Sequence, residues 1–190
     1  ASGQHLPRSK APSHIITTFH AKPLSMKAIK FTAYGGPEVL QLVDIPKPEP
    51  VGNEILVKIH ATAVNSGDWR VRRAEPWLVR LFFGLFKPKK QAQILGSAFS
   101  GVVEGLGEMA TKFKVGDEIF GSTEEHMQTY AEYLCVDENG AFAKKPTNLS
   151  HEEAATISFG GHTAYHFLKP LELDESKHVL IYGASGAVGT

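Results

Sequence analysis

The sequence predicts a mainly β barrel or sandwich over about the first 147 residues, followed by helical structure and the start of an α/β unit. Short segments that alternate apolar and polar residues recur between glycine and proline turns, which is typical of antiparallel sheets. At Asn148 the pattern changes to helical spacing. Near the end, the apolar run His178–Tyr182 precedes a glycine-rich turn, as expected for a parallel strand buried on both faces.

Composition limits the possible functions before any motif is considered. A chain of 190 residues allows one ordinary domain, or one domain and part of a second. Twenty basic and twenty acidic residues give a formal net charge of zero, so we expect no nucleic-acid partner. No apolar run approaches the ~20 residues of a membrane span, so we expect no membrane insertion. The single cysteine, Cys135, cannot build a disulfide framework or a multi-cysteine zinc site.

Six strands are expected from the alternating segments. Turn residues bound each of them, and Pro46, Pro48 and Pro50 interrupt regular structure between the second and the third. The predicted strands are Met26–Thr32, Val39–Ile45, Glu54–Val64, Val102–Leu106, Glu118–Phe120 and Tyr130–Val136.

A helical region is expected after the last of these strands. Ser150 followed by Glu153 has the spacing of a capping box, which marks a helix N-terminus. Apolar residues then follow at helical spacing up to Pro170, with the pair Gly160-Gly161 between them. The pattern therefore predicts one or two helical segments.

The glycine-rich turn after His178–Tyr182 is the motif that carries chemistry. Small residues let the backbone turn sharply out of a strand and bring its amide groups close to a pyrophosphate. The pattern is A-x-G-x-x-G, in which Ala184 takes the first glycine's place, and an ordinary glycine-rich turn is the alternative. The candidate cofactor-binding residues are Gly183, Ala184, Ser185, Gly186, Ala187, Val188 and Gly189.

Several short stretches, in order, resemble those of one superfamily. They are Tyr34–Leu40, Ala63–Asp68, Gly101–Glu104, Phe113–Gly121, Tyr130–Tyr133 and Gly183–Gly189. Together they resemble the medium-chain dehydrogenase/reductase superfamily, in particular its zinc-free, quinone-oxidoreductase-like branch. The resemblance implies a GroES-like β-barrel catalytic domain followed by a Rossmann domain.

The resemblance also implies a division of the chain. Residues 1–25 are expected to be a tail outside the fold, and residues 26–150 the GroES-like domain. Residues 151–190 would hold a linking helix, a first strand and the glycine turn of a truncated Rossmann domain. The chain is then a fragment, which we expect to be inactive alone. A cytoplasmic location is expected, and the leader, which has no acidic residue, leaves a mitochondrial one open.

Zinc ligands of related dehydrogenases are replaced at every matching position. Asn65 stands where zinc-dependent relatives carry a cysteine, and Ser97-Ala98 stand in place of a His-Glu pair. The third ligand position falls near Phe159. Since zinc needs thiolate, imidazole or carboxylate ligands, the resemblance implies a metal-free site.

Without a metal, the chemistry implied is hydride transfer from NADPH, or NADH, to a quinone or an activated enone. Asn65, Asp68 and Thr163 are the candidate catalytic residues, and for each a purely structural role is the alternative. Two other functions remain open: a zinc-type alcohol dehydrogenase relative, or a non-catalytic cofactor-binding protein of the same fold. The full-length protein is expected to be a homodimer that acts on a small molecule.

One further segment, Trp69–Lys90, interleaves basic and aromatic residues. Such a pattern could mark single-stranded nucleic acid or a membrane surface. Within the resemblance, a lid over the substrate pocket is favoured. Its lining would come from Trp77, Phe82, Phe83 and Phe86.

Overall fold

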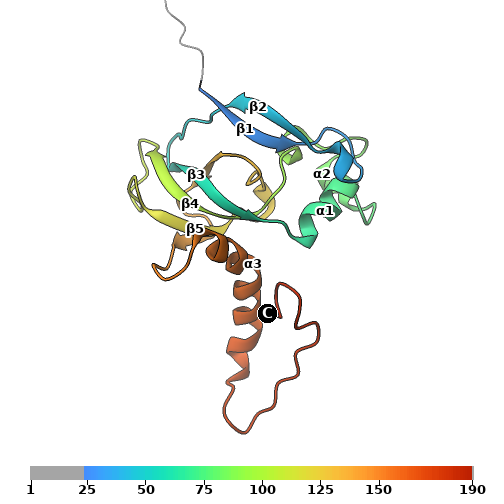
Figure 1. Cartoon of the computed structure of the whole chain (residues 1–190), viewed down its shortest axis with the longest axis vertical. Coiled ribbons are helices and arrows are strands. Elements are labelled where there is room, and N and C mark those ends of the chain that lie inside the picture. Colours follow the sequence, from blue (N-terminus) through green and yellow to red (C-terminus); the bar gives the residue numbers. More distant parts are fainter. Residues whose placement is uncertain (1–23, 190) are drawn as a thin grey trace, which may run out of the picture.

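A computed structural model describes residues 24–189, in which two antiparallel sheets enclose the core (Figure 1). β1 (Ser25–Lys30) pairs with β2 (Gln41–Pro46). The second sheet has the order β6-β3-β4-β5-β7. Its strands are β3 (Glu54–Ala63), β4 (Ala98–Leu106), β5 (Glu118–Ser122), β6 (Tyr133–Asp137) and β7 (Phe142–Lys144). Most of the predicted tail lies outside the described residues, and Ser25 already belongs to β1.

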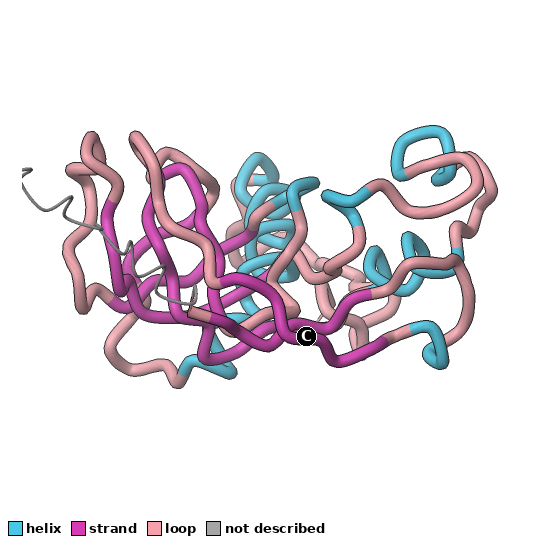
Figure 2. Tube along the Cα trace, turned by 90° about the horizontal axis from the view of Figure 1, so that it is seen from above, coloured by secondary structure: helices cyan, strands magenta, loops and turns pink. Residues whose placement is uncertain are grey.

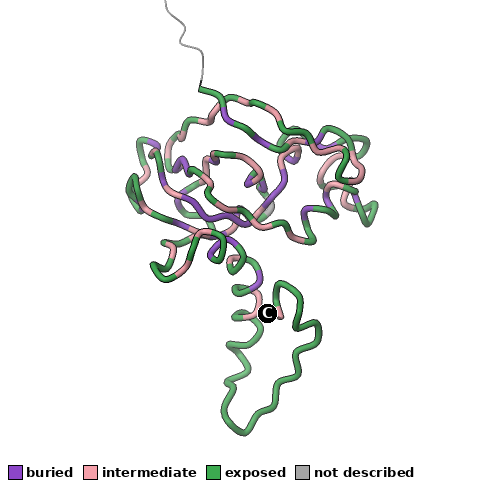
Figure 3. The backbone as a smooth tube through the Cα atoms, in the orientation of Figure 1, coloured by how far each residue is buried: buried purple, intermediate pink, exposed green. Residues whose placement is uncertain are grey.

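The core follows from the alternation of the strands. In β1, Met26 and Ala28 are buried while their neighbours face outwards. The largest buried cluster gathers apolar side chains from four strands and the loop before β5, and it runs along the strands as the buried stretch in Figure 3. Its buried members are Ile55, Val57, Phe99, Val103, Phe113, Ile119 and Leu134.

All six predicted strands are present, with shifted ends, and two features differ from the prediction. β4 begins at Ala98, four residues before the predicted start, because Ala98–Ser100 are buried on both faces and show no alternation. β7 was not predicted, since its three residues are too few to display a pattern.

Short helices gather at one end of the molecule in Figure 2, away from most of the strands. α1 (Ser66–Arg73) follows β3 directly, and α2 (Val79–Phe83) follows α1. α3 (His151–Leu168) packs against β3, β4 and β5 and then projects away from the sheet (Figure 1). Four single 3-10 turns complete the helices of the described residues: Pro37–Val39, Lys90–Ala92, Glu124–His126 and Lys169–Leu171.

The predicted capping box at the start of α3 is confirmed. Ser150 Oγ accepts from the Glu153 N–H at 3.1 Å, and the Glu153 carboxylate accepts from the Ser150 N–H at 2.8 Å. The helix then runs unbroken through Gly160-Gly161. Gly160 is buried where the glycine bend folds back on α3, and a Cβ there would collide with the Ala187 carbonyl oxygen.

The predicted strand His178–Tyr182 does not form. The segment is irregular, and Leu180 is 94% exposed. A parallel strand gains its hydrogen bonds and its buried faces from neighbouring strands. The described residues offer none beside this segment, which runs back along α3 (Figure 1). The apolar run therefore lacks the partners that its composition requires.

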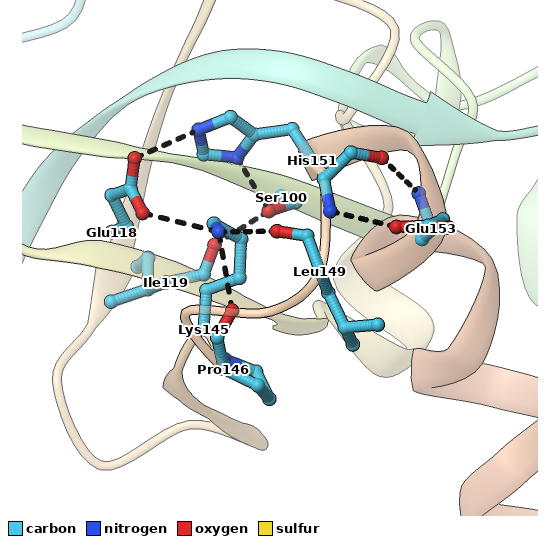
Figure 4. A network of polar contacts seen from close by, with 9 residues as sticks. Ser100, Glu118, Ile119, Lys145, Pro146, Leu149, His151 and Glu153 are labelled. Carbon is cyan, nitrogen blue, oxygen red and sulfur yellow. Dashed lines mark hydrogen bonds and ion pairs between the residues drawn. The ribbon is translucent and has the colours of Figure 1, made fainter.

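A polar network attaches the start of α3 to the sheet (Figure 4). Ser100 Oγ in β4 lies 2.8 Å from His151 Nδ1. Glu118 in β5 lies 3.5 Å from His151 Nε2 and also forms an ion pair with Lys145 at 3.1 Å. On the remaining face, the ring of His60 stacks on that of His151 with 4.6 Å between centroids. The linking helix is therefore fixed at its first residue.

We expect this attachment to weaken in mild acid. Burial lowers the pKa of His151 below its usual 6.5. The neighbouring His60 and Lys145 lower this pKa further, whereas the charges of Glu118 and Glu152 raise it by less than the total lowering. The contribution of His151 to the free energy of unfolding is therefore fully present above about pH 6.5. It decreases as the pH falls toward the lowered pKa, because His151 binds a proton more readily in the unfolded chain than in the folded one.

Thermal unfolding between about pH 8 and about pH 5 tests this expectation. The variant His151→Gln, which cannot titrate, should lose less of its Tm over this range than the original chain. His162→Gln, at an exposed position further along α3, serves as the control and should behave as the original chain. If the Tm of His151→Gln fell with decreasing pH as steeply as that of the original chain, His151 would not be the group that weakens the attachment.

Candidate active site

A cavity of about 620 Å³ lies where the end of β3, the start of α1, α3 and the glycine bend meet. The register of the sheet explains why. Ala63, the last residue of β3, pairs with Ala98, the first of β4, so the residues beyond these ends face each other. Residues from four parts of the chain line the cavity, among them Asn65, Ala98, Thr156, Phe159, Tyr182 and Gly183.

Asn65 holds a fixed orientation at the cavity wall. It is the N-cap of α1, and its Oδ1 accepts from the N–H groups of Gly67 at 2.8 Å and Asp68 at 3.3 Å. The cap fixes which end of the amide faces outwards. Nδ2 then donates to Ser97 Oγ at 3.1 Å, and its second N–H has no protein acceptor within residues 24–189. The site thus presents a hydrogen-bond donor.

Asp68 is buried and holds the Asn65 backbone in place. Its side chain is only 3% exposed and accepts three hydrogen bonds. Oδ2 accepts from the Asn65 N–H at 2.8 Å and from the Tyr130 hydroxyl at 2.9 Å, and Oδ1 accepts from the Gly96 N–H at 3.1 Å. Burial, and then the Asp68 charge, raise the pKa of Tyr130 above its usual value, so the phenol stays a donor. Asp68 therefore holds the Asn65 backbone and is not among the residues that line the cavity.

The glycine bend forms the opposite wall. Two successive turns shape it, in which the Gly186 N–H donates to the Gly183 carbonyl at 2.9 Å and the Gly189 N–H to the Gly186 carbonyl at 3.0 Å. Gly183 has a φ of +80°, which favours glycine, and a Cβ there would meet no atom within 4 Å. Of the seven predicted residues of the turn, all except Ala184 and Ser185 line the cavity.

Of the three positions matched to zinc ligands, two line this cavity and the third is hydrogen-bonded to one of them. Asn65 and Ser97 are joined by a hydrogen bond, and Phe159 lines the same cavity as Asn65. Their side chains offer an amide, a hydroxyl and an aromatic ring. Within residues 24–189, no group of three histidine, cysteine or acidic side chains is arranged to hold a metal ion.

Thr163 lies apart from Asn65. Its hydroxyl donates to the Phe159 carbonyl at 2.8 Å, and its side chain lines a neighbouring cavity of about 370 Å³ with His162 and His166. Phe159 lines both cavities, whereas Thr163 lines only the smaller one and Asn65 only the larger one. The structure thus brings Asn65 and Asp68, two of the three predicted catalytic residues, into direct contact. The third, Thr163, lies elsewhere, on α3.

The predicted lid does not cover this cavity. Phe83 packs against a second core cluster around Phe31 and Leu95. Trp77, Phe82 and Phe86 are 64%, 74% and 88% exposed, and none of the predicted lid residues lines the cavity beside Asn65.

Cys135 lies in β6, away from the site. Burial, and to a lesser degree the charge of Glu54, raise the pKa of its thiol to about 11. A thiol with so high a pKa is a poor nucleophile at neutral pH.

Comparison with known proteins identifies the family. Residues 52–165, more than half of the chain, match the family described as alcohol dehydrogenase GroES-like domain. The chain belongs to that family. The match confirms the fold class that the motifs implied, a GroES-like β domain followed by the start of an α/β domain. No helix of the described residues is long and apolar enough to span a membrane.

Several oxidoreductases align with most of the chain. Human quinone oxidoreductase is 34% identical over 167 residues, which are 86% of this chain and 47% of the relative. The 2-methylene-furan-3-one reductase of Solanum lycopersicum is 31% identical over 192 residues, covering 96% and 47% respectively. The solved structure of the quinone oxidoreductase from Coxiella burnetii superimposes with a TM-score of 0.76 at 34% identity, covering 87% of this chain and 51% of that one. The chain therefore spans about half the length of these relatives.

Proposed function

We propose that the whole protein transfers a hydride from NAD(P)H to a quinone or an activated enone without a metal ion. The observation that carries the proposal is the oriented amide of Asn65, a residue that lines the cavity beside the glycine bend and keeps one N–H group without a protein acceptor within residues 24–189. The names of the human and tomato relatives support both acceptor classes.

The glycine bend is proposed to bind the phosphates of the dinucleotide. Gly183 leaves open space where any other residue would place a Cβ, so backbone can approach a ligand closely. A bound nicotinamide would supply the hydride, and the chain's own residues would supply position and polarity. Zinc, in contrast, does not fit the amide, hydroxyl and phenyl groups of Asn65, Ser97 and Phe159.

Hydride addition to a quinone or enone places negative charge on the acceptor oxygen. The second N–H of Asn65 can donate to that oxygen, and Ser97 Oγ lies next to it as the partner of the first N–H. A donor that is already oriented stabilises the developing charge without reorganisation. Asp68 holds the Asn65 backbone and is a positioning residue. Thr163 remains a candidate for contact with the nucleotide through the neighbouring cavity.

Three narrower statements belong to this proposal. NADPH is the expected donor rather than NADH, the whole protein is expected to be a homodimer, and a cytoplasmic location is expected. Residues 151–190 are proposed to open the nucleotide-binding domain, and residues 26–150 to form the catalytic one.

The test is NADPH oxidation by the whole protein with a panel of quinones and enones, before and after dialysis against a chelator, with zinc measured by elemental analysis. We expect oxidation that the chelator does not diminish. Tight NADPH binding with no oxidation of any acceptor would favour the non-catalytic alternative. Stoichiometric zinc and a loss of activity that zinc restores would favour the alcohol dehydrogenase alternative.

A further inference from the structure

The end of the molecule that carries α2 presents an exposed apolar surface, which we call the aromatic tip. Its six members lie on α2 and on the segments before and after it, and each of them is about half exposed or more. They are Trp77, Leu78, Leu81, Phe82, Leu85 and Phe86. Exposed large apolar side chains gathered on one short segment are typical of an interaction site.

The aromatic tip is held in place by the fold. Val79 and Phe83, four residues apart on α2, pack against the second core cluster and anchor the helix. The Tyr34 hydroxyl donates to the Gly84 carbonyl at 2.6 Å, and the Lys89 N–H donates to the Phe83 carbonyl at 2.7 Å. The packing of α2 and the bonds at its C-terminal end therefore hold the segment, and within residues 24–189 the apolar side chains of the tip stay exposed.

Basic residues flank the tip in the sequence, and Lys87, Lys89 and Lys90, which follow it directly, are exposed. In a chain with a net charge of zero, residues 69–90 contain seven basic residues and one acidic residue. The acidic one, Glu75, is paired with Arg73 at 3.3 Å. The basic residues are Arg70, Arg72, Arg73, Arg80, Lys87, Lys89 and Lys90.

We propose that the aromatic tip docks the protein on the surface of an anionic phospholipid bilayer. Tryptophan, phenylalanine and leucine side chains enter the boundary between headgroups and acyl chains, while lysine and arginine attract anionic lipids. The three leucines of the tip distinguish this surface from a single-stranded nucleic-acid site, where aromatic rings stack on bases. The tip lies away from α3, at the helical end of the molecule in Figure 2. The inference is independent of the proposed hydride transfer.

Flotation of the whole protein with vesicles tests the proposal. We expect binding to phosphatidylcholine vesicles that contain phosphatidylserine, weak binding to pure phosphatidylcholine, and release at high salt. Replacing Lys87, Lys89 and Lys90 by glutamine should weaken binding about fivefold per lysine. Phe82→Ser with Phe86→Ser should weaken binding about tenfold or more.

Matched controls replace residues of the same kind at other exposed positions. They are Lys112→Gln with Lys114→Gln for charge, and Leu42→Ser with Val115→Ser for apolar surface. These controls should bind as the original protein does. Circular dichroism of every variant establishes that the fold is kept.

Tryptophan fluorescence gives an independent measurement. Residues 1–190 contain two tryptophans, Trp69 and Trp77. The difference spectrum between the Trp69→Phe protein and the Trp69→Phe/Trp77→Phe protein isolates the emission of Trp77. On anionic vesicles its emission should shift to shorter wavelength and be quenched by brominated acyl chains.

Three results would overturn the proposal. The first is equal binding to neutral and anionic vesicles, or binding to neither. The second is unchanged Trp77 emission on vesicles that the protein binds. The third is dimerisation without lipid, or RNA binding, that the Phe82→Ser/Phe86→Ser variant abolishes while vesicle binding is unaffected.

Discussion

Replacing Asn65 with aspartate is expected to preserve the fold and to reduce kcat/KM of the whole protein about 100-fold or more. Aspartate caps a helix as well as asparagine does, so the hydrogen bonds from Gly67 and Asp68 can persist. The variant replaces the N–H donor with a carboxylate oxygen, which repels the negative charge on the acceptor. Steady-state kinetics with a quinone, alongside thermal unfolding, separates the two effects.

Two control variants sharpen this prediction. Asn65→Ala removes the cap together with the donor, so it should lose about 1 kcal/mol of stability in addition to activity. Ser97→Ala removes only the partner of the first N–H, so its effect on kcat/KM should be smaller than that of Asn65→Asp. Full activity in a folded Asn65→Asp variant would show that the amide donor takes no part in the reaction.

Replacing Asp68 with alanine is expected to lower the free energy of unfolding by about 3 kcal/mol. The change leaves three donors without their acceptor in a buried site: two backbone N–H groups and the Tyr130 hydroxyl. Urea denaturation measures the loss. Tyr130→Phe, which removes one of the three bonds, should cost less.

An exposed aspartate provides the matched control for Asp68. Asp44→Ala, in β2, should change stability by less than about 0.5 kcal/mol. A loss for Asp68→Ala no larger than that of this control would mean that Asp68 does not hold the segments together.

The strands could be predicted because their burial alternates. The alternation of β1 and β3 is visible in the sequence, and so is the capping box of α3. α1 was missed, although Asn65 and Asp68 have the spacing of a capping box that uses aspartate. The run His178–Tyr182 was predicted as a strand and is irregular in the structure, because strand formation depends on neighbouring strands as well as on composition.

The candidate site was only partly visible in the sequence. Asn65 could be singled out through the resemblance, because it stands at the position of a zinc ligand, and the structure adds what fixes its amide. Tyr130, which supports Asp68, lies 62 residues further along the chain, and no local spacing joins the two. The register of β3 against β4 brings Ser97 beside Asn65, and that register emerges only when the sheet is assembled.

The most direct test follows the hydride itself. The whole protein, stripped of metal by a chelator, is given an enone and NADPH in which deuterium replaces both hydrogens at C4 of the nicotinamide. We expect deuterium at the β-carbon of the product, at a rate that added zinc does not raise. Product without deuterium, or turnover that appears only when zinc is returned, would contradict the account.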